Sequence, residues 1–213
     1  YPSNGVVSVA TDGAPMIAVG QSVSILSGKT LDNGLHFINL ITNKEIGMLS
    51  TKEKLAQSTY TGVSGAPLFD KNTGAMVVGS ENGVLYTTET TSTLTERFDH
   101  VLGNLTYDFT TQRYRTLISK QDKKQTNINN AVAMYSSYIY YGDKAGVVQC
   151  VDANTLSTVW AINTGDAVNA TIALDMDDES TVALYTGNTV LNQGKNGVCT
   201  IRRVNALTGK IDW

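Results

Sequence analysis

Hydrophobic and polar positions along the chain repeat one module four times. Each module has an apolar strand, a turn containing glycine, a second apolar strand that opens on glycine, and a polar turn. The glycines that open these strands are Gly34, Gly83, Gly146 and Gly197, at intervals of 49, 63 and 51 residues. Repetition over tens of residues is typical of propellers and solenoids. We therefore expect an all-β chain made of four similar units.

Each unit has room for four strands of about five residues, the size of a propeller blade. The blades expected from the pattern cover residues 6–49, 62–126, 131–165 and 170–213. The second repeat is the weak copy, because its fourth strand is not obvious. Residues 105–109 and 114–118 are candidates for that strand and for an extra hairpin.

The last two repeats align with each other from their tryptophans backwards. The matched pairs are Val151 with Val204, Asp152 with Asn205, Ala153 with Ala206, Thr155 with Thr208, and Trp160 with Trp213. The match includes the polar turn and the strand after it. We expect these two stretches to adopt the same structure.

Composition supports strands and tight turns rather than helices. Hydrophobic residues make up 41% of the 213 positions and charged residues only 16%, against about 25% charged in an ordinary soluble domain. Thr, Ser, Asn, Gly and Tyr fill the difference. The net charge of −3 gives no long-range field, which argues against a nucleic-acid partner. No apolar run is long enough to cross a membrane.

The chain has two cysteines, Cys150 and Cys199, which lie 49 residues apart on corresponding strands of neighbouring repeats. Two cysteines are too few for the disulfide framework of a small secreted domain. Two buried thiols are the simpler interpretation. A bridge between the two strands is geometrically conceivable, so the redox state of the pair stays open.

The pattern of apolar strand, glycine turn, apolar strand, Asp-Ala-x-Thr-Gly-Lys and Trp resembles the quinoprotein-type (PQQ-like) β-propeller repeat. The best matches are 138–160 and 198–213. In that family a tryptophan and a turn glycine dock one blade on the next. The resemblance implies this role for Trp160 and Trp213, while Gly47 holds the tryptophan position in the first repeat.

Propellers of this type commonly have seven or eight blades, so the resemblance implies that four blades are half of a ring. The sequence also stops inside an expected strand at Trp213, which suggests a fragment. Two apolar blade flanks would then be open. The rest of the propeller, a second copy or another partner would cover them. A closed ring of four blades is the alternative.

The resemblance also raises an enzyme hypothesis, oxidation of an alcohol or sugar with bound pyrroloquinoline quinone (PQQ) and calcium. The alcohol-oxidising members stack the quinone between a tryptophan and a disulfide of adjacent cysteines. Cys150 and Cys199 are not adjacent, and both tryptophans are assigned to docking. We therefore expect no cofactor and no catalytic residue in this stretch.

Two groups of residues are candidates for a metal site or a catalytic site. Asp175, Asp177 and Asp178 gather oxygen ligands in an expected turn and are a weak calcium candidate, because calcium needs six to eight oxygens and no glycine follows. Ser64 lies in a stretch similar to a serine-protease nucleophile, with His36 upstream. The first strand of a blade explains that stretch without catalysis.

Four tyrosines at 135, 138, 140 and 141 are a candidate aromatic surface. Alternation along a strand places Tyr138 and Tyr140 on one face and Tyr141 on the other. Packing between neighbouring blades explains both faces equally well, and we favour it.

These observations favour a non-enzymatic binding or assembly scaffold, exported to the cell surface or periplasm. Its contacts would come from the long insertions at 21–33, 91–130 and 186–196, for a protein or carbohydrate ligand. A PQQ-dependent dehydrogenase with catalytic groups elsewhere and a ligand-sensing extracellular domain are the alternatives. The function of such a fold depends on the residues of a particular site rather than on the fold, and the sequence shows no clear site of this kind.

Overall fold

A computed structural model describes residues 2–9, 15–21, 34–51, 62–69, 76–88, 97–99, 104–106, 112–116, 127–178, 181–189 and 201–213. For 2–9, 88, 97–99, 104–106, 112–116, 177 and 178 it describes the backbone alone. All regular elements in these ranges are β-strands. In the described ranges no helix is long and apolar enough to cross a membrane.

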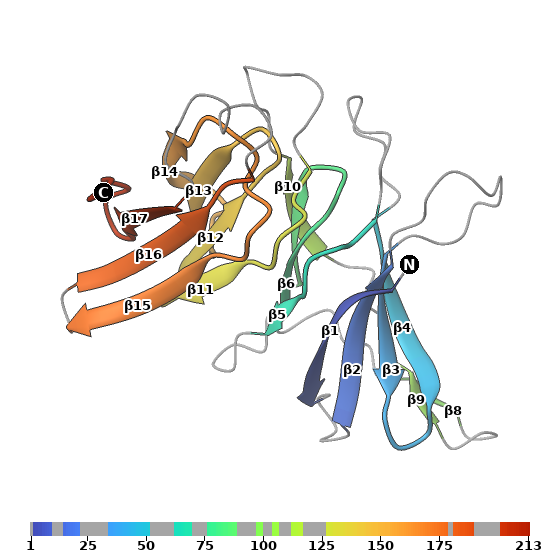
Figure 1. Ribbon diagram of the computed structural model, residues 1–213. Helices are drawn as coiled ribbons and strands as arrows, with labels where there is room; N and C mark the ends of the chain where they lie inside the picture. The colour runs from blue at the N-terminus through green and yellow to red at the C-terminus, as the bar shows by residue number, and fades with distance from the viewer. Residues whose placement is uncertain are drawn as a thin grey trace, which may run out of the picture.

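The strands form successive antiparallel sheets, which we call the first to fourth blades (Figure 1). The first blade is β1 (Pro2–Val9), β2 (Pro15–Gln21), β3 (Gly34–Asn39) and β4 (Lys44–Ser50). The second is β5 (Leu68–Phe69), β6 (Met76–Gly79), β7 (Val84–Thr88) and β10 (Gln112–Thr116). The third is β11 (Ala133–Tyr135), β12 (Tyr138–Gly142), β13 (Val147–Asp152) and β14 (Thr158–Asn163). The fourth is β15 (Ala173–Asp178), β16 (Thr181–Gly187) and β17 (Ile201–Asn205).

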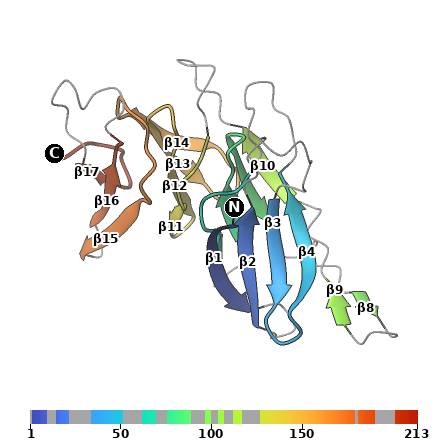
Figure 2. The same ribbon diagram turned by 45° about the vertical axis from the view of Figure 1, so that its right-hand side comes forward.

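The weak second repeat is completed by a strand far along the chain. β10 pairs with β7 and overlaps the candidate strand 114–118. The other candidate, 105–109, overlaps β9 (Asn104–Thr106), which forms an extra hairpin with β8 (Arg97–Asp99). This hairpin lies beside β4 of the first blade (Figure 2). The insertion in the second blade therefore reaches back to its neighbour.

The fourth blade also has the beginning of a fourth strand. Ile211 forms an antiparallel bridge with Val204, and Arg203 N–H donates to the Trp213 carbonyl at 3.0 Å. The same register occurs in the third blade, where Trp160 lies opposite Cys150. The structural equivalence of Trp160 and Trp213 expected from the alignment is therefore confirmed.

Each blade buries a face against the next one, as expected for a β-propeller. Three apolar clusters lie between the first and second, second and third, and third and fourth blades. The first strands of the third and fourth blades, β11 and β15, contact each other across the blade boundary, as expected if the first strand of each blade is innermost. In both ribbon views the blades follow one another around an arc (Figures 1 and 2). The fold is thus a β-propeller assembled by stacking of sheets.

The two end blades are covered on one face only. In β2 the buried residues Met16 and Ala18 alternate with the half-buried Ile17 and Val19. In β6, by contrast, all four residues are buried. A strand between two blades buries both faces, whereas a strand at the end of the arc buries one. The described residues therefore form an open arc, not the closed four-bladed ring that was the alternative.

A glycine is the last residue of the second strand in the second, third and fourth blades, and at two of these positions a larger residue would not fit. A Cβ on Gly79 would lie 2.2 Å from Cγ2 of Ile128, and one on Gly142 would lie 2.4 Å from Cγ1 of Val168. Ile128 and Val168 belong to the lead-in segments before β11 and β15, and both are fully buried. The glycine thus leaves the space that an aliphatic side chain of the next blade fills.

The same lead-in residues also bind the preceding blade through their main chains. Ile128 N–H donates to the Ser80 carbonyl at 3.1 Å, and Val168 N–H donates to the Asp143 carbonyl at 3.0 Å. Earlier in the chain, Val63 N–H donates to the Gln21 carbonyl at 3.2 Å. One hydrogen bond is therefore repeated at three blade boundaries.

The tryptophan docking implied by the family resemblance is present between the third and fourth blades. Trp160 Nε1–H donates to the Ala206 carbonyl at 2.8 Å. Its ring lies over Gly209, where a Cβ would come within 2.7 Å of the indole. Gly209 has a φ of 73°, which glycine adopts without strain.

We predict that Gly142→Ala lowers the free energy of unfolding by ~1–3 kcal/mol, because the added methyl overpacks against Val168. Adding Val168→Ala should recover most of that loss, although Val168→Ala alone is destabilising because it opens a cavity. Urea unfolding of the two single variants and the double variant measures this coupling. Additive losses would show that the glycine is not needed for this contact.

Candidate functional site

The lead-in segments and the turns after the second strands meet at one end of the blades. The same hydrogen bond holds them in three blades. Glu81 N–H donates to Gly62 O at 2.8 Å, Lys144 N–H to Asn127 O at 3.0 Å, and Thr189 N–H to Ala167 O at 2.9 Å. We call the polar residues gathered here the inner rim: Ser64, Glu81, Asn129, Asn130, Lys144, Asn169 and Thr189.

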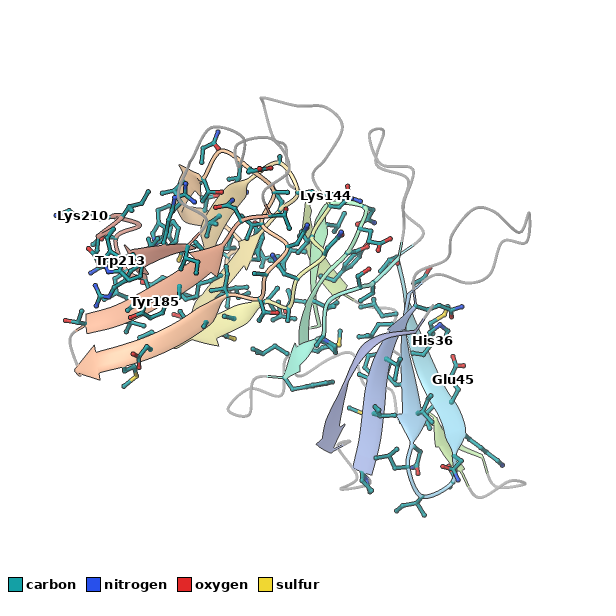
Figure 3. The ribbon with its side chains drawn as sticks, in the orientation of Figure 1. His36, Glu45, Lys144, Tyr185, Lys210 and Trp213 are labelled. Atoms are coloured by element: carbon teal, nitrogen blue, oxygen red, sulfur yellow. The ribbon has the colours of Figure 1, made fainter. Side chains whose placement is uncertain are left out.

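Rim side chains pair within their own blades. Ser64 Oγ–H donates to the carboxylate of Glu81, and Asn169 Nδ2–H donates to Thr189 Oγ1 at 3.3 Å. Asn129 and Lys144 hold the corresponding positions in the third blade, and Lys144 lies at this end of the molecule (Figure 3). The rim therefore carries one acid, one base and neutral amides or hydroxyls.

Three amide oxygens of the inner rim have no hydrogen-bond partner among the described residues: the Oδ1 atoms of Asn129, Asn130 and Asn169. Nearly all buried polar atoms in proteins are hydrogen-bonded to protein or water. The three oxygens are themselves buried, but Asn129 and Asn169 are partly exposed residues, whereas Asn130 is buried. Asn129 and Asn130 belong to the lead-in of the third blade and Asn169 to that of the fourth.

Asn130 also ties two blades together. Its Nδ2 donates to the Gly142 carbonyl at 3.1 Å and to the Val168 carbonyl at 2.9 Å. The residue is 2% exposed. Its backbone packs against the lead-in of the second blade, where a Cβ on Gly65 would lie 2.2 Å from the main-chain carbonyl oxygen of Asn130. Asn130 therefore contacts the lead-ins on both sides.

A second polar cluster joins the third and fourth blades beside the rim. Arg202 donates to the Asn188 side chain and, at 3.0 Å, to the Thr164 carbonyl. Asn188 Nδ2 donates to Thr164 Oγ1 at 2.7 Å. This cluster therefore holds Asn188, which follows β16, against the segment that follows β14.

Asp143 is a buried carboxyl in the β12–β13 turn. It is 1% exposed, and its Oδ1 accepts a hydrogen bond from Val147 N–H at 3.0 Å. Burial raises the pKa of Asp143 to about 6, although hydrogen bonds from the turn's N–H groups, led by Val147, oppose the shift. The carboxyl shapes the turn that receives Val168, so its role is structural.

The acidic residues proposed as a calcium site do not lie in a turn. The structure places Asp175, Asp177 and Asp178 in β15, where Asp175 pairs with Ala183 and Asp178 pairs with Thr181. A β-bulge lies between Met176 and Asp178. The turn expectation was wrong because β15 continues almost to the hairpin end. Asp175 is exposed, and the calcium site stays an untested prediction.

Ser64 and His36, the two residues of the protease-like hypothesis, contact other residues and not each other. Ser64 donates to Glu81, whereas His36 Nδ1 lies 3.3 Å from Glu45 Oε1 in the first blade. His36 points away from the face of its neighbours Leu35 and Phe37, which are fully buried. The structure therefore supports the interpretation of this stretch as part of a blade.

The tyrosines pack between blades, as we favoured. Tyr140 and Tyr141 are fully buried, Tyr140 toward the fourth blade and Tyr141 toward the second. Burial, and then the nearby Cys150 thiol, raise the pKa of Tyr140 far above its usual value. Burial raises the pKa of Cys150 to about 11, which makes its thiol unreactive. Cys199 lies outside the described residues.

Sequence reasoning singled out Ser64 for a different chemistry and missed the other residues of the inner rim. Its only local signal is the asparagine-rich stretch 127–130, which comes directly before β11. Asn129 and Asn130 carry no recognisable motif, because the partners of Asn130 are backbone carbonyls 12 and 38 residues away.

Comparisons with known proteins identify the fold but no family. No protein-family profile matches the chain, and no curated protein matches it. Among solved structures, the chain is similar to the computationally designed Ika8 protein (TM-score 0.51, 16% identity, 99% of this chain and 58% of Ika8). It is also similar to BamB from Moraxella catarrhalis (0.51, 12%, 100% and 50%) and to Saccharomyces cerevisiae Sqt1 (0.57, 13%, 94% and 45%).

The chain spans about half the length of the structures it resembles, 45–58%. At identities of 12–16% the likeness shows the fold alone. The chain is thus a β-propeller segment, and its activity has to be inferred from its own residues.

We predict that Asp143→Asn makes stability less dependent on pH. The raised pKa means that the folded protein binds the Asp143 proton more tightly than the unfolded chain. That stabilisation is complete below the unfolded pKa of 3.8 and is lost as the pH rises through about 6. Relative to the variant, the native protein should lose up to ~3 kcal/mol between about pH 4 and pH 7. Urea unfolding across this range measures the difference, and a constant difference would contradict the prediction.

We also predict that Asn130→Asp destabilises the protein by ~2–4 kcal/mol near neutral pH, because a carboxylate would replace an amide that donates to two buried carbonyls. Asn205→Asp is the matched control, since Oδ1 of Asn205 only accepts hydrogen bonds from Leu207 and Thr208. Asp152 holds the position of Asn205 in the third blade, and its Oδ1 accepts the same two turn hydrogen bonds, so a carboxylate is compatible with this turn. Thermal unfolding should leave the control within ~0.5 kcal/mol of the native protein. Equal losses in both variants would argue against the bridging role of Asn130.

Proposed function

We propose that this chain is a non-enzymatic scaffold that binds a polypeptide partner at the inner rim. The observation that carries the proposal is the pair of partly exposed rim amides, Asn129 and Asn169, whose Oδ1 atoms have no hydrogen-bond partner among the described residues. They occur in successive blades that repeated hydrogen bonds hold in place. A rigid site with unsatisfied acceptors can bind without reorganising its own backbone.

The chemistry of the rim favours a polypeptide. Glu81 and Lys144 supply one charge of each sign, and the net charge of the chain is only −3. A strongly charged ligand such as a nucleic acid would need a more one-sided surface. Spaced amide acceptors suit the N–H groups of an extended main chain.

Two of the insertions expected to contact a partner continue from residues beside the rim. Gln21 O accepts a hydrogen bond from Val63 N–H, and Thr189 N–H donates to the Ala167 carbonyl. Connections between the strands of a rigid frame are a usual place for partner contacts. The proposal therefore includes residues 22–33 and 190–196, which lie outside the described residues, in the binding surface.

We further propose that the repeats are of the PQQ-like type, supported by the docking of Trp160 on Gly209. The quinone-dependent alternative is less well supported. Trp160 and Cys150 both pack between the third and fourth blades, so neither side chain can stack on a cofactor there. Export to the cell surface or periplasm remains a proposal that rests on composition.

The function is tested with a random peptide library selected on the immobilised chain. The double variant Asn129→Ala/Asn169→Ala should bind the selected peptides about tenfold more weakly, because it removes two acceptors. Asn154→Ala, an exposed change in the β13–β14 turn, is the control. Unchanged binding by the double variant, with its circular dichroism unaltered, would refute the rim as the binding surface.

The enzyme alternative has its own measurement. PQQ and Ca²⁺ are added to the chain, and quinone absorbance and reduction of an electron-acceptor dye with an alcohol or sugar are followed. We expect neither signal to change. A specific spectral shift with substrate-dependent dye reduction would replace the scaffold proposal with a dehydrogenase.

A further inference from the structure

The third and fourth blades carry the same aromatic pair in the same register. Tyr140 and Trp160 have ring centroids 6.0 Å apart, and Tyr185 and Trp213 have centroids 6.3 Å apart. In the third blade the fourth blade covers this pair, and Tyr140 is fully buried. In the fourth blade nothing among the described residues covers it, and Trp213 is 61% exposed.

The first blade has the features that receive such a tryptophan. In the fourth blade, Trp160 docks on a turn in which Asn205 Oδ1 accepts the N–H groups of Leu207 and Thr208 at 3.1 and 3.0 Å. In the first blade, Asn39 Oδ1 accepts hydrogen bonds from the N–H groups of Ile41 and Thr42 at 2.8 and 3.0 Å. The two turns therefore have the same construction.

The equivalence extends to the residues that touch the indole. Gly209 N–H donates to the Asn205 carbonyl, and Asn43 N–H donates to the Asn39 carbonyl. Asn43 has a φ of 55°, close to the 73° of Gly209. Leu40 corresponds to Ala206, whose carbonyl accepts the Trp160 N–H. On the first blade this turn is uncovered, since Leu40 is 40% exposed and the following Ile41 is 70% exposed.

The sheet faces match as well. Leu184 and Val204 are paired across β16 and β17 and fully buried against the third blade. Their counterparts Ile17 and Ile38 are paired across β2 and β3 in the same way. Both counterparts are only half-buried, because no blade lies on that face within the described residues. The first blade thus offers an apolar face of the kind that packs on a preceding blade.

On each of the two flanks, polar side chains among the described residues contact each other. Arg203 donates to Asp212 on the fourth blade, and His36 lies 3.3 Å from Glu45 on the first. Tyr185 and Trp213 lie at one end of the arc and His36 and Glu45 at the other (Figure 3). Covering the flank of the fourth blade would bury Arg203 and Asp212 as an ion pair rather than singly, which avoids the largest desolvation cost.

We propose that the fourth blade of one copy docks on the first blade of a second copy, with Trp213 on the turn of Leu40 and Asn43. Two such contacts, related by a two-fold axis, join two four-bladed arcs into one ring. A second copy is the occupant because the chain carries both surfaces of such a contact. The Trp213 flank of its fourth blade matches the Trp160 flank of the third blade, and the Asn43 turn of its first blade matches the Gly209 turn on which Trp160 docks.

The test is the mass of the 213-residue chain in solution, measured by sedimentation equilibrium. We expect a concentration-dependent species of twice the 22.9 kDa chain. Trp213→Ala should weaken self-association at least tenfold, whereas Val159→Ala, an exposed apolar residue on β14, should not change it. Circular dichroism and thermal unfolding of each variant show that it is folded. A native chain that stays monomeric, or a dimer that Trp213→Ala leaves intact, would overturn the proposal.

A mixing experiment tests the geometry itself. Leu40→Glu should weaken self-association as Trp213→Ala does, because it alters the other half of the same contact. In a mixture of the two variants, Trp213 of one chain can meet Leu40 of the other, so each mixed pair keeps one native contact. Mixed dimers should therefore form at lower concentration than dimers of either variant alone. Association no tighter than in the separate variants would contradict this arrangement.

Discussion

The packing of each blade's lead-in segment on the second strand of the preceding blade is the constraint on which the structure depends. Ile128 and Val168 fill the space over Gly79 and Gly142, and their N–H groups bind the carbonyls next to those glycines. A sheet buried on both faces cannot be stable alone, because its apolar sides need cover. The junction sets how each blade meets its neighbour, so the arc follows from a local contact repeated along the chain.

The same constraint explains where binding surfaces lie. At the inner rim, tight junctions bring polar lead-in residues together and leave the amide oxygens of Asn129 and Asn169 without partners. At the ends of the arc, the junction has no second half, so Trp213 and Leu40 remain exposed. The rim presents hydrogen-bond acceptors and the flanks present apolar surface. The two kinds of surface therefore suit different partners, a polypeptide ligand and another blade.

Several structural details were readable in the sequence because they depend on residues close together in the chain. Strand alternation, the glycine turns and the alignment of Trp160 with Trp213 are local patterns with a direct backbone cause. Where a long insertion interrupted the repeat, the prediction weakened, and the strand that completes the second blade was located only in part. The acidic run at Asp175 was misplaced for a related reason, since a bulge and a short hairpin let the strand continue through polar residues.

The repeat pattern in the sequence determined that this chain is built from four β units of a propeller, and the family resemblance implied blade docking by Trp160 and Trp213, which the structure shows for Trp160. Only the tertiary structure showed that Asn130 bridges two blades and that Asp143 is a buried carboxyl with a raised pKa. It also showed that the arc is open within the described residues. The physical reason is that strand and turn preferences act over a few neighbouring residues, whereas burial and amide satisfaction depend on groups brought together from distant blades.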